Sequence, residues 1–227
     1  ASEGASDVAQ KVEGTRESMP GSSVLAGVKV AMVTMGCAKN EVDSARMRGL
    51  LRSAGATIVD DGAASDLIIV NTCSFIQSAT EESIEAVFDA IGLSESVGAD
   101  IPVIVSGCMP ARYGSDLEDS LAEVAAFVPC SKEDDIVRIA SDALAARSLK
   151  DGRASQIYAS APVMDTELDP VCDSRSFAYV KISDGCDRWC SYCTIPMIRG
   201  RYHSFTFDEV DANVSSHVES GKKEIVL

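Results

Sequence analysis

The stretch DLIIVNTCSF, residues 66–75, decides the fold. Its first part, DLIIVNT (66–72), is almost continuously apolar, which is typical of a strand buried on both faces of a parallel sheet. Cys73 follows this strand directly. The same arrangement occurs twice more, because Cys37 comes shortly after the apolar run 28–34 and Cys108 directly after the run 101–107.

Segments with helical spacing of apolar residues alternate with these strands. The predicted strands span 28–34, 66–72, 101–107 and 125–129. The predicted helices span 40–55, 78–93, 112–124 and 131–147. Strands alternating with helices form parallel sheets covered on both faces, so residues 28–148 are predicted to be one doubly wound α/β domain.

The rest of the chain is expected to divide into three parts. Residues 1–27 are small and polar and predict a flexible leader, and the polar, aperiodic residues 149–175 predict a linker. A second domain is expected over residues 176–227, with a strand at 177–185, a helix at 206–221 and a strand from 223. We expect this second domain to be truncated after its first β-α unit.

Composition narrows the possible functions. The 227 residues carry a net charge of −15, which argues against a general phosphate-binding surface, although a local basic site remains compatible. No apolar run reaches membrane-spanning length, and no hydrophobic signal segment is seen, so a cytoplasmic location is expected. In that setting eight cysteines indicate metal binding or catalysis rather than disulfides.

Cys37, Cys73 and Cys108 each follow a predicted parallel strand. The carboxyl ends of such strands share one edge of the sheet, where ligands bind, so these thiols are expected to converge there. The alternative is that each is a buried core cysteine. That alternative suits the two remaining cysteines better. Cys130 follows the last predicted strand but without a preceding glycine, and Cys172 lies in the predicted linker.

The segment GCDRWCSYC (185–193) holds a second triplet, Cys186, Cys190 and Cys193, spaced C-x3-C-x2-C. Structural zinc usually needs four protein ligands, whereas three cysteines can hold a 4Fe–4S cluster and leave one iron open. Two further classes stay possible on the residues alone, namely a zinc-binding interaction module and an iron–sulfur electron carrier.

The second triplet resembles the radical S-adenosylmethionine (SAM) superfamily, with Tyr192 before its last cysteine as is usual there. The surrounding residues resemble its methylthiotransferase family. GCAKNEVDSARM (36–47) and GCMPARYGSDL (107–117) are similar to the type that modifies small-subunit ribosomal protein S-twelve (RimO type). The runner-up is the tRNA adenosine type (MiaB type). Ala45 and Phe205 depart from the first pattern.

The resemblance implies two 4Fe–4S clusters, one held by Cys186, Cys190 and Cys193 and binding SAM, the other held by Cys37, Cys73 and Cys108. It also implies transfer of a methylthio group to the β-carbon of an aspartate in ribosomal protein S-twelve, with flavodoxin or ferredoxin as electron donor. We expect this chain alone to be inactive. No catalytic residue beyond the ligands is predicted.

Several neighbours of the cysteines have two interpretations each. Asp187 and Arg188 are interpreted as solvated loop charges, and Trp189 as either a shield for the cluster or a packing residue. Arg199, with Gly200, either resembles a family feature or forms a structural turn. His203 and His217 are interpreted as surface or turn residues rather than ligands, and Asn40 and Asn71 as residues that orient the first cluster's loops.

Overall fold

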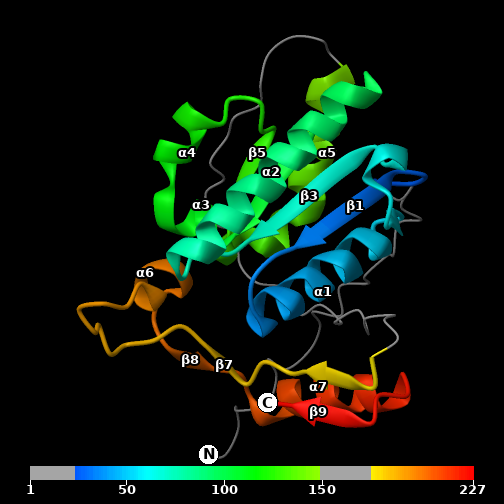
Figure 1. Cartoon of the computed structure of the whole chain (residues 1–227). Helices are drawn as coiled ribbons and strands as arrows, with labels where there is room; N and C mark the ends of the chain where they lie inside the picture. The colour runs from blue at the N-terminus through cyan, green and yellow to red at the C-terminus, as the bar shows by residue number, and fades with distance from the viewer. Residues whose placement is uncertain (1–23, 149–174) are drawn as a thin grey trace, which may run out of the picture.

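A computed structural model of the chain describes residues 24–148 and 175–227 (Figure 1). Its largest element in that part of the chain is a parallel sheet of five strands in the order β2-β1-β3-β4-β5. The strands are β1 (Lys29–Thr34), β2 (Thr57–Val59), β3 (Leu67–Thr72), β4 (Val103–Gly107) and β5 (Ala126–Pro129). The short edge strand β2 was not predicted.

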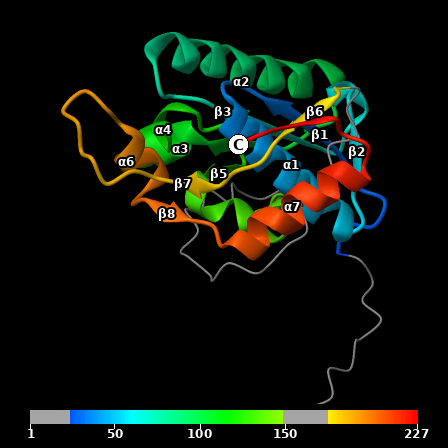
Figure 2. The same ribbon diagram turned by 90° about the horizontal axis from the view of Figure 1, so that it is seen from below.

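Helices cover both faces of this sheet, which confirms the doubly wound α/β fold (Figure 2). α1 (Ala38–Ser53) and α5 (Ile136–Ser148) pack on one face, and α2 (Gln77–Val97), α3 (Cys108–Tyr113) and α4 (Ser115–Ser120) on the other. Every residue of β3 is buried because it is the central strand, covered on both faces and paired on both edges.

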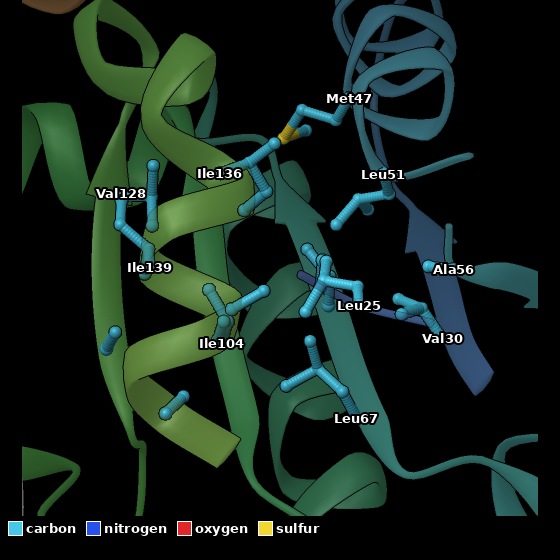
Figure 3. Packing of buried hydrophobic residues seen from close by; sticks show 14 residues of the cluster. Leu25, Val30, Met47, Leu51, Ala56, Leu67, Ile104, Val128, Ile136 and Ile139 are labelled. Atoms are coloured by element: carbon cyan, nitrogen blue, oxygen red, sulfur yellow. The ribbon is translucent and has the colours of Figure 1, made fainter. Parts of the chain in front are cut away.

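Figure 3 shows the core beneath α1 and α5. Its large buried side chains are Leu25, Val30, Met47, Leu51, Leu67, Ile104, Val128, Ile136 and Ile139. Leu25 had been expected in the flexible leader, but its side chain is only 1% exposed and its N–H donates to the carbonyl of Ala54. Residues 24–27 therefore belong to the folded unit, whereas the rest of the predicted leader and linker positions 149–174 lie outside the described residues.

Two predicted helices differ from the structure. The single helix expected over 112–124 is two short helices, α3 and α4, that meet at Gly114, where φ is +49° and ψ is −123°. The helix expected from residue 131 begins as a 3-10 helix, η2 (Cys130–Asp135), and becomes α-helical at Ile136. In both places the apolar spacing is helical, but the backbone angles change along it, and such a change cannot be read from the spacing.

Residues 175–227, which we call the second unit, contain a β-α-β arrangement. β6 (Phe177–Tyr179) and β9 (Glu224–Val226) pair in parallel, and α7 (Phe207–Glu219) connects them. Thr206 caps α7 in a capping box with Glu209, which satisfies the first free N–H groups of the helix. The strand predicted over 177–185 is interrupted, because a separate strand β7 (Ser183–Asp184) pairs antiparallel with β8 (His203–Ser204).

The segment that connects β7 to β8 contains the second cysteine triplet and lies beside the five-stranded sheet. Between these strands lies α6 (Ile195–Arg199), which contacts α3 at the carboxyl edge of the sheet. Figure 1 shows the arrowheads of β1 and β3 pointing toward the side on which α6 lies. The two triplets therefore lie on the same side of the molecule. None of the helices in the described ranges is long and apolar enough to cross a membrane.

Replacing Gly107 with alanine is expected to destabilise the fold far more than the same change at Gly98. At Gly107 φ is +94°, and a Cβ would lie 2.3 Å from Asn71 Oδ1 and 2.6 Å from the Thr72 carbonyl oxygen. At Gly98 φ is +63° but no atom lies within 4 Å, so only backbone strain of about 1 kcal/mol is expected. Gly107→Ala should lower the free energy of unfolding by about 3 kcal/mol or more in denaturant titration. Equal losses in the two variants would contradict the close approach.

Candidate functional site

The structure brings Cys37, Cys73 and Cys108 to the carboxyl edge of the sheet, and we call these three residues the first cysteine site. Cys37 precedes α1 and is exposed. Cys73 directly follows β3 and Cys108 is the first residue of α3, and both are buried. The amide oxygen Oδ1 of Asn40 lies 3.6 Å from the sulfur of Cys37 and 3.7 Å from that of Cys108. One buried side chain thus contacts two of the three thiols.

Glycine allows the third thiol to approach. Gly36 has φ of +93°, and a Cβ built there would lie 2.4 Å from the Cβ and 2.8 Å from the sulfur of Cys73. Only a residue without a side chain fits between the end of β1 and this thiol. The glycine that precedes Cys37 is therefore needed for the close packing of the first cysteine site.

The two asparagines of this region form a buried network. Asn40 Nδ2 donates to the carbonyl of Thr72 at 2.9 Å, and Asn71 Nδ2 donates to the carbonyl of Asn40 at 3.0 Å and to Ser44 Oγ at 2.9 Å. Both amides are fully buried. This network joins the start of α1 to the end of β3, so Asn40 and Asn71 do hold the backbone around the first cysteine site, as expected.

A fourth thiol adjoins the first cysteine site. Cys130 follows β5 next to Cys108, since Gly107 and Pro129 are register partners on neighbouring strands. The hydrogen bond with Cys130, together with burial, raises the pKa of Cys108 to about 12. The hydrogen bond with Cys108 and burial raise the pKa of Cys73 as well. The charge of Arg199 lowers both pKa values but does not offset these effects, so the two thiols are protonated when no metal is bound. Cys172 lies outside the described residues.

The second triplet lies on a more open segment, and we call residues 185–193 the second cysteine loop. Cys190 is exposed, whereas Cys186 and Cys193 are half-buried. The N–H of Cys186 donates to the carbonyl of Gly200 at 3.1 Å, and that of Cys193 to the carbonyl of Cys190 at 3.0 Å. Backbone hydrogen bonds therefore hold two of the three cysteines.

Several residues in and after this loop differ in contacts or exposure from what the sequence indicated. Asp187 accepts a hydrogen bond from the N–H of Tyr202 at 3.3 Å, so its carboxylate closes the loop. Trp189 is 64% exposed with φ of +50°, and Tyr192 is 89% exposed, so neither ring packs against the described residues as a shield. His217, expected at the surface, is buried in α7.

Four charged residues connect the second unit to the first cysteine site. Arg199 Nη1 lies 2.6 Å from Asp43 Oδ2 and 3.4 Å from Asp184 Oδ2. Lys181 is paired with the other oxygen of Asp43 and lies 3.1 Å from Asp184 Oδ2. All four side chains are largely buried, and we call them the ion-pair network.

Mutual attraction keeps this network charged despite its burial. Burial opposes ionisation of Asp184, but Lys181 and Arg199 overcome it and lower the pKa of that carboxyl to about 2. Burial likewise disfavours the cation of Lys181, yet Asp43 and Asp184 hold its pKa above the ordinary value. For the neighbouring Glu133, burial and the charge of Asp43 raise the pKa, and the cations Arg199, Lys181 and Arg46 offset this rise only in part.

Sequence reasoning missed this network. In the sequence, Asp43 is recognisable only as part of a family pattern, and Arg199 is compatible with either a family feature or a structural turn. The only available signal was that the cation lies six residues after Cys193, close to a cysteine motif. Its partner Asp43 lies on α1, 156 residues earlier, so no local pattern could identify this pair.

Each site offers three thiols, a donor set that could hold a 4Fe–4S cluster. In the described ranges no group of three or more His, Cys, Asp or Glu side chains could enclose one ion. A cubane instead binds each thiolate at a different iron, so its ligands stand farther apart. Buried hydroxyls next to each triplet, Ser74 Oγ and Thr194 Oγ1, have no protein partner in the part of the chain that the structure describes. Such donors suit the sulfides of an iron–sulfur cluster.

Asn40→Ala is expected to destabilise the protein, because it leaves the Thr72 carbonyl without its donor and removes the amide oxygen that contacts two thiols. A buried group that loses its partner costs about 2 kcal/mol, which denaturant titration of the metal-free protein can measure. The exposed amide of Gln77 provides the control, since Gln77→Ala should change stability by less than about 0.5 kcal/mol. Similar effects at the two positions would show that the Asn40 network contributes little.

Comparison with known proteins agrees with this architecture. Residues 29–129 match the family described as "Uncharacterized protein family UPF0004". Curated relatives carry the name "Ribosomal protein uS12 methylthiotransferase RimO". The chain is 36% identical to the one from Natranaerobius thermophilus over 203 residues, 88% of this chain and 44% of that protein.

Two further relatives of that name show the same extent of similarity. Identity is 39% with the protein from Opitutus terrae, over 88% of this chain and 44% of the relative. It is 40% with the one from Pelobacter propionicus, over 87% of this chain and 43% of the relative. The chain thus spans about 44% of the length of these relatives. On these similarities and on the matched first domain, the chain belongs to the RimO-type methylthiotransferase family.

Proposed function

We propose that this chain is part of a radical SAM enzyme that adds a methylthio group to the β-carbon of an aspartate in ribosomal protein uS12. The observation that carries the proposal is the presence of two separate cysteine triplets, whose segments meet where α6 contacts α3. Each triplet leaves one iron of a 4Fe–4S cluster without a protein ligand, and the two tasks of the reaction need two such irons. The names of the relatives supply the substrate.

In this proposal each triplet has its own role. Cys186, Cys190 and Cys193 hold the cluster that binds SAM, and Cys37, Cys73 and Cys108 hold the cluster that carries the sulfur. When bound, these groups supply one-electron cleavage of SAM and the sulfur for transfer. The protein contributes positioning and exclusion of water.

The environments of the two triplets suit these roles. Cys73 and Cys108 are buried and the Asn40 amide contacts the thiols of Cys37 and Cys108, so the site is shielded on the side of the sheet and open only at Cys37. The second cysteine loop is open, with Cys190 and Tyr192 exposed. A cosubstrate such as SAM can reach this loop without rearrangement of the sheet.

A protein substrate suits the charge of the chain better than an RNA. The net charge is −15 and the aromatic content is 5%, whereas RNA recognition usually needs cationic surface and aromatic stacking. We place the reaction in the cytoplasm, where the ribosomal protein is made, with flavodoxin or ferredoxin as the electron donor. A tRNA adenosine methylthiotransferase is the runner-up, and a non-catalytic zinc or iron–sulfur module is the alternative of another class.

Anaerobic reconstitution of the chain with iron and sulfide is expected to give about eight irons per molecule, the sum of two cubanes. Changing Cys186, Cys190 and Cys193 together to alanine should leave about four, and so should the same change at the first cysteine site. Cys130→Ala is the matched control and should retain about eight. Iron analysis and visible absorbance provide the measurement. A parent protein that binds zinc, or four irons or fewer, would contradict the two-cluster proposal.

The substrate is tested in a host strain that lacks its own methylthiotransferases and carries the complete gene encoding this chain. Mass spectrometry of ribosomal protein uS12 should show a methylthio group on one aspartate, with tRNA nucleosides unchanged. The gene with Cys186→Ala is the control and should leave uS12 unmodified. Methylthio-adenosine in tRNA with unmodified uS12 would favour the runner-up.

A further inference from the structure

Arg199 belongs to the second unit but ends at the first cysteine site. It is the last residue of α6, a helix that begins two residues after Cys193. Its side chain is only 4% exposed, and its Nη2 lies 3.0 Å from Asn40 Oδ1 and 3.7 Å from the sulfur of Cys108. The guanidinium therefore contacts one cysteine directly and shares the Asn40 amide with Cys37.

The backbone next to Arg199 holds the other triplet. The carbonyl of Gly200 accepts the N–H of Cys186 at 3.1 Å. Between Cys193 and Arg199 the chain is a single short helix, in which Pro196 and Ile198 are buried. Residues 199 and 200 thus contact both cysteine triplets, one through a side chain and the other through a carbonyl.

The charge of Arg199 is fixed in place by the carboxylate of Asp43. A guanidinium remains charged when buried and forms several hydrogen bonds in one plane, which a lysine cannot reproduce. Asp43 also pairs with Lys181, so the carboxylate is shared between two cations from the second unit. The four charges of the ion-pair network cancel overall, but its guanidinium contacts the first cysteine site directly, because Arg199 Nη2 lies 3.7 Å from the sulfur of Cys108.

Positive charge beside an iron–sulfur cluster favours its reduced form, because reduction adds a negative charge. We propose that Arg199 is a positioning residue that raises the reduction potential of a cluster bound at the first cysteine site and holds the second cysteine loop against that site. This proposal rests on the proposed function, since it assumes a cluster held by Cys37, Cys73 and Cys108. The strength of the effect is set by Asp43, which partly neutralises the guanidinium.

The first experiment measures the reduction potential of that cluster alone. The chain with Cys186, Cys190 and Cys193 changed to alanine is reconstituted, its iron is counted, and it is titrated with a reductant under electron paramagnetic resonance. Arg199→Met should shift the midpoint potential to more negative values, and Arg199→Lys should shift it less. Asp43→Asn should shift it to more positive values, because it releases the charge of Arg199. Opposite shifts cannot come from simple loosening of the structure.

Arg147→Met provides the matched control. This arginine is also partly buried and donates to the carbonyls of Asp66 and Ala99, at the opposite edge of the sheet, so its loss should not move the potential. Normal iron loading with an unchanged potential in Arg199→Met would overturn the role of Arg199 alone, as would shifts of the same sign in Arg199→Met and Asp43→Asn. A parent protein that binds no iron overturns the proposed function and this role with it.

The second experiment needs no metal. Hydrogen exchange of the metal-free chain should become several-fold faster at Cys186 and its neighbours in Arg199→Met, because the Gly200 carbonyl is no longer held in place. Arg199→Lys should lie between this variant and the parent, and Arg147→Met should match the parent in this segment. Unchanged exchange in Arg199→Met would overturn the positioning part of the inference.

Discussion

The arrangement of the molecule depends on one constraint, that a parallel sheet with both faces covered sends every strand in the same direction. Each crossover helix returns the chain to the opposite edge, so the carboxyl ends of β1, β3 and β4 meet. The segments after these strands carry Cys37, Cys73 and Cys108. The hydrophobic effect that buries the strands therefore also assembles the first cysteine site, without any contact between the thiols being needed for folding.

Assembly at this edge creates a second requirement, that polar groups buried there find partners. Asn40 and Asn71 satisfy it for the backbone by bonding to carbonyls at the ends of the strands. Asp43 would be an uncompensated buried charge within the first domain alone, and its partners Lys181 and Arg199 come from the second unit. The same ion pairs that stabilise α1 thus dock the second unit onto the carboxyl edge.

This docking joins two sites of unlike character. Two thiols of the first cysteine site, Cys73 and Cys108, are buried, and hydrogen bonds between cysteines together with burial raise their pKa values. The second cysteine loop is open, and its Trp189 and Tyr192 side chains are largely exposed. A buried sulfur site beside an accessible cofactor loop is an arrangement suited to protected storage of a reactive group and to exchange of a small cosubstrate. Arg199 lies where the two meet.

The sequence by itself determined the fold class, the four longer strands of the first domain and the convergence of three cysteines at one edge, because these follow from local apolar patterning and the geometry of parallel sheets. It also indicated both triplets, since their spacing is visible along the chain. It did not indicate the short strands β2, β7 and β8. Tertiary structure alone decided the partners of Asp43 and Arg199, the approach of Gly36 to Cys73 and the break at Gly114. Those features arise from contacts between residues distant in sequence, or from backbone angles, and neither leaves a periodic signal.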